Sequence, residues 1–112
     1  MMDSILTSIK KMLGIAEEYD NFDTDLIMHI NSVLTILNQL GVGPETGYSI
    51  TNKYNTWNEF LPEGQRLECV KSYMYLKVKQ LFDPPTISAV AESNKRLCDE
   101  LEWRISVTVD PG

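Results

Sequence analysis

The sequence predicts an all-α protein, a small bundle of about four to five helices with a long loop and an extended C-terminal tail. Four segments carry apolar residues at the spacings of three and four that place them on one side of a helix. Three of these segments end at a glycine or at prolines, residues that stop helices. The 112 residues, 43% of them hydrophobic and 23% charged, match one globular domain. We therefore expect a helical domain over residues 1–104 and a tail over residues 105–112.

The first two helices are expected over residues 4–13 and about 24–40. A glycine directly follows each of them, Gly14 and Gly41, and glycine readily takes the left-handed conformation that ends a helix. Asp23 stands at the N-cap position of the second helix, where its carboxylate could accept hydrogen bonds from exposed amides. The apolar positions of the two helices are Ile5, Ile9, Met12, Leu13, Leu26, Ile30, Val33, Leu37 and Leu40.

The long loop is expected over residues 41–55, which are rich in glycine, proline, asparagine and threonine and show no helical period. A loop of this length is uncommon in a compact domain unless it is functional or becomes ordered against a partner. Thr56 can then cap a single helical turn that carries Trp57 and Phe60 and that Pro62 closes. We expect these two aromatic side chains to cover the core.

Two longer helices are expected over residues 66–82 and from Ser88 to about residue 105. Pro84 and Pro85 separate them, because proline lacks an amide donor and holds the preceding residue out of the helical region. The first of the two has two apolar stripes and should contact neighbours on more than one side. These stripes are Leu67, Val70, Met74, Val78 and Leu81, and Cys69, Tyr73 and Leu76; in the last helix the apolar positions are Val90, Ala91, Leu97, Cys98, Leu101 and Ile105.

The C-terminal residues alternate between apolar and polar, which is typical of an extended strand. In that conformation Ile105, Val107 and Val109 point to one side of the chain. Because the domain offers no partner strand, we expect the tail to be mobile in the free protein. It would become ordered against a neighbouring protein, which could pair with its backbone and cover its apolar edge.

The net charge of −6 opposes binding to DNA phosphates and to anionic membranes. No stretch approaches the roughly 20 apolar residues that span a bilayer. Asp3 and Lys10 interrupt what would be the apolar region of a signal peptide. We therefore expect neither a sequence-specific DNA-binding protein nor a secreted or membrane-embedded protein.

Residues that could carry catalysis or hold a metal are few. His29 is the single histidine, and Cys69 and Cys98 have no spacing that a zinc site needs. The acidic run over residues 20–25 has Phe22 at a position where a calcium loop needs an oxygen ligand. The sequence therefore predicts no enzyme, no cofactor and no metal.

Aromatic residues outside the helical stripes are better candidates for function. Tyr48 and Tyr54 lie in the long loop, and Trp103 lies just before the tail. Tyrosine and tryptophan are enriched where proteins contact one another. The candidate protein-contact residues are therefore Tyr48, Tyr54, Trp103, Ile105, Val107 and Val109.

Three blocks of the sequence resemble a known family. They are DTDLIMHINSVLTILNQLGVGP over residues 23–44, VKSYMYLKVKQLFDPP over residues 70–85 and ELEWRISV over residues 100–107, with TWNEFL between the first two. In this order and spacing they are similar to the small head-tail connector, or adaptor, proteins of tailed bacteriophages and prophages. The resemblance covers most of the chain, and none of the blocks is a catalytic signature.

The resemblance implies a structural subunit without active site or cofactor. Such a subunit forms a ring on the portal protein at the DNA-packaging vertex, joins head to tail and receives head-completion or tail proteins. It would be assembled in the cytoplasm of the bacterial host and end at the head-tail junction of the virion. Free, it would be a monomer or weak oligomer, and DNA would pass its channel without specific binding. The alternative is a small helical phage-encoded regulator or inhibitor that acts by binding another protein.

Overall fold

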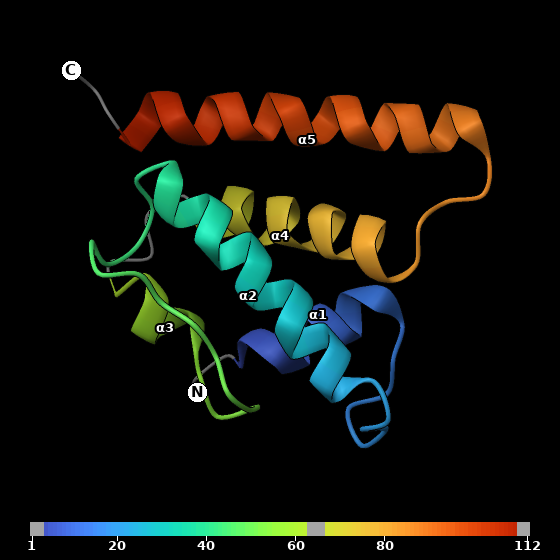
Figure 1. Ribbon diagram of the computed structural model, residues 1–112, viewed down its shortest axis with the longest axis horizontal. Helices are drawn as coiled ribbons and strands as arrows, with labels where there is room; N and C mark the ends of the chain where they lie inside the picture. The colour runs from blue at the N-terminus through green and yellow to red at the C-terminus, as the bar shows by residue number, and fades with distance from the viewer. Residues whose placement is uncertain (1–3, 63–66, 110–112) are drawn as a thin grey trace.

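The computed structural model describes residues 4–62 and 67–109, and within them the chain forms helices and no strand (Figure 1). This confirms the all-α prediction. The helices are α1 (Ile5–Leu13), α2 (Asp23–Gln39), α3 (Trp57–Phe60), α4 (Leu67–Phe82) and α5 (Ser88–Val109).

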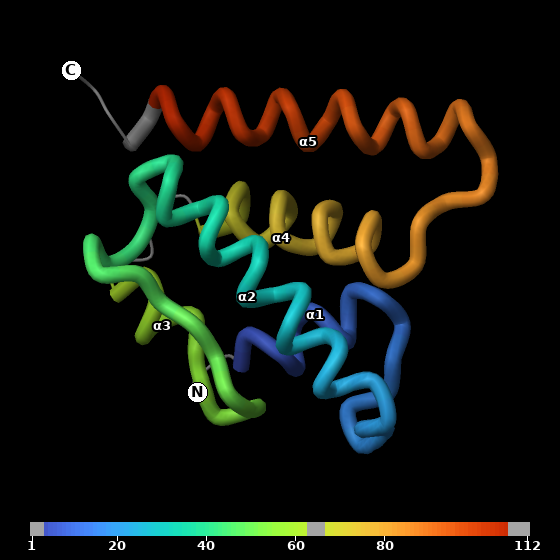
Figure 2. Tube along the Cα trace, in the orientation of Figure 1, coloured from blue at the N-terminus to red at the C-terminus, as the bar shows by residue number. Residues whose placement is uncertain are grey.

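Helix α4 lies between two layers (Figure 1). It packs against α1 and α2 on one side and against α5 on the other, as its two apolar stripes predict. The molecule is flat, with extents of 42 × 36 × 22 Å. Figure 2 shows the segment after α2 turning past α3 and running back toward the N-terminal end of the chain. The single helical turn α3 therefore closes one end of the layer formed by α1 and α2.

The core lies where α1, α2 and α4 meet. Each buried aliphatic side chain contributes about 1.5–3 kcal/mol relative to exposure, so this cluster supplies most of the stabilisation. Its fully buried members are mainly those that the helical spacing predicts: Ile5, Ile9, Leu26, Ile30, Val33, Leu37, Val70, Met74 and Val78.

The predicted helix ends are confirmed at both glycines. Gly14 and Gly41 have φ values of 81° and 88°, in the left-handed region. After α2, the Gly41 amide donates to the Asn38 carbonyl, and the Val42 amide donates to the Leu37 carbonyl. This pair of hydrogen bonds satisfies carbonyls that the helix itself leaves open, and Val42 is buried as the chain turns.

The predicted capping role of Asp23 is wrong. Helix α2 begins at Asp23 after Phe22, and no side chain caps its first amides. The Asp23 carboxylate instead pairs with Lys10 Nζ at 2.9 Å, and the Lys10 side chain is only 3% exposed. Lys10 Nζ also donates to the Glu17 carbonyl at 2.8 Å. A buried ammonium needs such partners more than the helix end needs a cap, because unpaired charge is costly away from water.

The long loop is confirmed, and its order comes from its own chain. The Asn31 side chain accepts from the Ile50 amide at 2.8 Å and donates to the Ile50 carbonyl at 3.0 Å. The Asn38 side chain donates to the Pro44 carbonyl at 3.0 Å. Because Ile50 is itself buried, the loop is held against α2 without a partner protein.

The turn α3 forms as predicted. The Thr56 hydroxyl accepts from the Glu59 amide, and the Glu59 carboxylate accepts from the Thr56 amide, which satisfies two exposed donors at once. Trp57 and Phe60 are both buried, so they cover the core. Gly43 fits closely here, because a Cβ on it would lie 2.4 Å from Phe60 Cε1.

The predicted extended conformation of residues 105–109 is wrong. Helix α5 continues through Ile105 and Val107 to Val109, and Ile105 is fully buried. A β-branched residue loses only a few tenths of a kcal/mol in a helix, whereas burying isoleucine gains about 1.5–3 kcal/mol. Helix formation also pairs the backbone without a second strand. Residues 110–112 of the predicted tail lie outside the described residues.

A single substitution tests whether the end of α5 belongs to the core. Ile105→Ala should lower the free energy of unfolding by about 2–4 kcal/mol, because it leaves a cavity in the core. Val107→Ala, on the exposed side of the same helix, should change it by less than about 0.5 kcal/mol. Urea denaturation of the two variants measures the difference. Equal, small effects would mean that the end of α5 is a dispensable tail.

Candidate protein-contact surface

Helix α5 exposes more large apolar side chains than it buries. Among its described side chains, Cys98 and Ile105 are the fully buried ones. The large apolar side chains that it exposes are Val90, Leu97, Trp103 and Val107. An apolar surface of this kind is a common mark of contact with another protein.

Trp103 and Val107 form the part of this surface that points directly away from the core. They are 65% and 47% exposed, and their spacing of four residues makes them neighbours along the helix. Cys98 and Ile105 lie on the opposite side at the helical period. We call Trp103 and Val107 the outer α5 patch. Arg104 and Glu100 border it and pair with each other at 2.9 Å.

Polar contacts join the inner side of α5 to α4, in addition to the burial of Cys98 and Ile105. The Tyr73 hydroxyl donates to Glu102 Oε2 at 2.8 Å, and Lys77 Nζ lies 3.8 Å from the same atom. Gln80 Nε2 donates to Cys98 Sγ at 3.4 Å. These directional contacts and the burial of Cys98 and Ile105 favour the same rotation of α5, in which Trp103 and Val107 face outward.

Burial raises the pKa of the Tyr73 hydroxyl, and its hydrogen bond to the Glu102 carboxylate raises it further. The phenol therefore stays protonated and keeps donating at neutral pH. Burial also raises the pKa of the Cys98 thiol, so this cysteine remains an unreactive thiol between α4 and α5.

The structure separates the remaining sequence candidates. Tyr54 is 74% exposed in the long loop and is available for contact. Tyr48 is half-buried, its hydroxyl donates to Glu59 Oε1 at 2.8 Å, and burial raises its pKa to about 12. Ile105 lies in the core, and Val109 belongs to α5 without a described side chain. The candidates that share one surface are therefore Trp103 and Val107.

Sequence reasoning missed two other exposed groups. Val90 and Leu97 fit the helical stripe of α5, yet both lie beside the line of residues that faces α4. Tyr19 and Phe22 form an edge-to-face pair, with ring centroids 5.5 Å apart, and both are exposed between α1 and α2. Two aromatic residues in an otherwise acidic linker were the available signal for the second group.

The described residues offer no cluster for a metal ion and no helix suited to spanning a membrane. In residues 4–62 and 67–109, no three histidine, cysteine, aspartate or glutamate side chains gather closely enough to hold a metal ion. His29 is half-buried, with its ring centroid 6.5 Å from that of Phe82. Over the same part of the chain, none of the helices combines the length and apolar character needed to span a membrane.

Comparison with known proteins gives one finding. A family model described as phage connector protein matches residues 5–112, which is nearly the whole chain. No curated protein and no solved structure matches the chain significantly.

The polar seam between α4 and α5 yields a test with a pH signature. Tyr73→Phe should lower the free energy of unfolding at neutral pH by about 1 kcal/mol, because Glu102 loses a donor. A raised pKa in the folded state stabilises the fold while the phenol is protonated. That contribution is complete below the ordinary tyrosine pKa of about 10 and disappears as the pH rises further.

The native protein should therefore lose stability above this pH more steeply than Tyr73→Phe does. Urea denaturation across the alkaline range measures both slopes, and Tyr54→Phe, at an exposed ring, is the matched control. Identical alkaline slopes for the native protein and Tyr73→Phe would contradict this account of the seam.

Proposed function

The chain belongs to the phage connector protein family, and on that premise we propose that it forms a ring on the portal protein and joins the phage head to the tail. The family is a structural one, so the protein is a component of the phage particle rather than a member of an enzyme family. The match over residues 5–112 is the observation that carries the proposal. In this role the subunit acts without catalysis and without a cofactor.

The outer α5 patch supports a role in protein assembly. An exposed tryptophan beside an exposed valine offers a large apolar contact in the last two turns of α5. A bordering ion pair, Glu100 with Arg104, gives this patch the polar rim typical of interfaces. We assign the patch to contact with the portal or with a head-completion or tail protein.

The charge of the chain supports a passive relation to DNA. Proteins that bind DNA gain affinity when their lysine and arginine side chains release counterions from the phosphates. A subunit with a net charge of −6 gains little in this way. In the proposed ring, DNA passes through the channel without specific binding, and the subunit resides at the head-tail junction after assembly in the host cytoplasm.

The regulator or inhibitor hypothesis has weaker support. It also requires a protein-contact surface, which α5 would provide equally well. The family match favours the connector role, because it covers nearly the whole chain rather than one helix.

Trp103→Ala tests the assigned surface. It should leave the fold intact and weaken binding to portal-bearing heads by about 2 kcal/mol or more, roughly thirtyfold, as expected for a tryptophan at an interface centre. Met28→Ala is the matched control, because Met28 is a large apolar residue that is 59% exposed on α2. Binding of purified variants to heads measures the effect. Equal binding by the two variants would remove the outer α5 patch from the interface.

Assembly state provides a second test. The purified protein should be monomeric or weakly associated at micromolar concentration and should form rings when the portal is present. Each ring contact can be too weak alone, yet a template that holds neighbours side by side raises their effective concentration. Native mass spectrometry with and without portal measures this. A tight dimer with two-fold symmetry would favour the regulator instead.

A further inference from the structure

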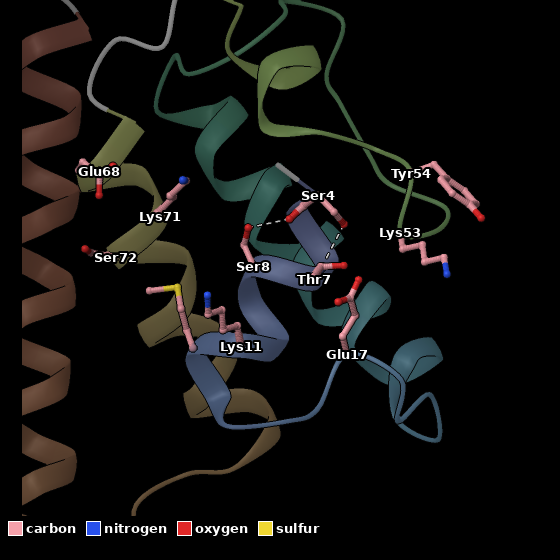
Figure 3. Close-up of a pocket in the computed structure, with 11 residues that line it drawn as sticks. Ser4, Thr7, Ser8, Lys11, Glu17, Lys53, Tyr54, Glu68, Lys71 and Ser72 are labelled. Carbon is pink, nitrogen blue, oxygen red and sulfur yellow. Dashed lines mark hydrogen bonds between the residues drawn. The ribbon is translucent and has the colours of Figure 1, made fainter. Parts of the chain in front are cut away.

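A groove opens on the side of the molecule formed by α1, the start of α4 and the loop that carries Lys53 (Figure 3). Its volume is about 790 Å³. Lys11, Lys53 and Lys71 line it, one from each of these three elements. We call it the lysine groove. It gathers three positive charges on a chain whose net charge is −6.

Hydroxyl groups in fixed positions lie between these lysines (Figure 3). Ser4 Oγ accepts from the Thr7 amide at 3.1 Å, where it caps α1. Ser8 Oγ donates to the Ser4 carbonyl at 2.7 Å and accepts from Trp57 Nε1 at 3.1 Å. These bonds tie the hydroxyls to α1 and α3. The groove is therefore a preformed polar surface, which lowers the entropy that a ligand loses on binding.

Two of the groove lysines have no carboxylate partner of their own. Elsewhere in the described residues, Lys77, Lys79, Lys95 and Arg104 pair with carboxylates of the same chain. No such ion pair is present for Lys11 or Lys53 among the described residues, although Lys53 Nζ lies 5.5 Å from the ring centre of Tyr54. Both side chains are exposed, so they can meet carboxylates from outside the chain.

The linker between α1 and α2 presents such carboxylates. Glu18, Tyr19 and Asp20 are all exposed, and we call them the acidic turn. Buried Lys10 tethers the linker on both sides of this turn, through the Glu17 carbonyl and the Asp23 carboxylate. The turn is therefore held outside the groove of its own chain, with its side chains directed to solvent.

We propose that the acidic turn of one copy docks into the lysine groove of a second copy of this chain. The inference rests on the proposed ring, and it names the surfaces through which neighbours meet. Copies with a net charge of −6 repel one another unless opposite charges face each other at the contact. The turn and the groove provide that complementarity, with Tyr19 able to lie against Tyr54 at the groove edge. Because the two surfaces differ, the contact is head-to-tail and can repeat around an axis.

Charge distinguishes this occupant from DNA. Glu17 and Glu68 also line the groove (Figure 3). They would repel a continuous row of phosphates, whereas a protein segment can place single carboxylates between them and offer amides to them. A double-stranded DNA oligonucleotide is therefore the competing ligand in the test.

The test uses two charge-reversed variants of the full chain. Lys11→Glu/Lys53→Glu reverses the groove, and Glu18→Lys/Asp20→Lys reverses the turn. All four side chains are exposed and take no part in the core, so circular dichroism and thermal melting should match the native protein. Self-association is measured by sedimentation equilibrium up to millimolar concentration at low salt.

Each variant alone should associate about tenfold more weakly than the native protein, because exposed pairs are individually weak but reversal turns attraction into repulsion. An equimolar mixture should regain native association, since the intact turn of one variant meets the intact groove of the other, and the two reversed surfaces also match. Native association by either variant alone, or no recovery in the mixture, would overturn the proposal. So would an assembly of the native protein that stops at two copies, or DNA binding that the groove reversal abolishes.

A different measurement tests the connector role itself. If the native protein does not bind portal-bearing heads, the connector role is wrong whatever the mixture shows. If it binds them and the mixture does not recover, the ring uses other surfaces.

Discussion

Helix α4 packs against α1 and α2 on one side and against α5 on the other, and the arrangement of the other helices depends on these two contacts. Its Met74 and Val78 side belongs to the core with α1 and α2, while Tyr73 and Gln80 meet α5. A helix in the middle layer has little surface left for solvent. The contact with α1 and α2 can therefore be apolar while the contact with α5 includes polar groups, because each involves a different stripe of α4. The consequence is a flat molecule in which α4 lies between the α1–α2 layer and α5.

Different forces dominate on the two sides of α4. Between α1, α2 and α4, burial of aliphatic side chains is non-directional and large. Between α4 and α5, hydrogen bonds to Glu102 and Cys98 are directional and individually small. The second arrangement, together with burial of Cys98 and Ile105, leaves Trp103 on the outer side of α5. The fold thus exposes an apolar surface, which we propose as a protein contact, on a stable scaffold.

The buried charge of Lys10 also shapes the chain around it. A buried ammonium is unfavourable unless partners surround it, and here the partners are parts of one linker. Pairing with Asp23 and the Glu17 carbonyl stabilises the ammonium and at the same time shapes the linker. The exposed carboxylates of that linker, beside the lysine groove, give each subunit surfaces of opposite sign despite its acidic total.

The sequence by itself determined what depends on neighbours along the chain. Helical spacing predicts the four longer helices, glycine predicts the ends at Gly14 and Gly41, and Thr56 and Pro62 predict the single turn α3. Trp103 could be named as a candidate contact for the same local reason, because an aromatic side chain there falls outside the apolar stripe. The family could also be recognised from the order and spacing of three blocks.

Tertiary structure alone decided the outcomes that depend on contacts distant in sequence. Whether Asp23 caps a helix or pairs with Lys10 depends on the approach of α1 to α2. Whether residues 105–109 are extended or helical depends on burial of Ile105, because an alternating segment is compatible with both conformations. Whether Leu97 is core or surface depends on the rotation of α5, which buries Cys98 and Ile105 and brings Glu102 to Tyr73. Local patterns specify a helix and its apolar side. Which part of the protein that side contacts is decided by the free energy of packing between segments distant in the sequence.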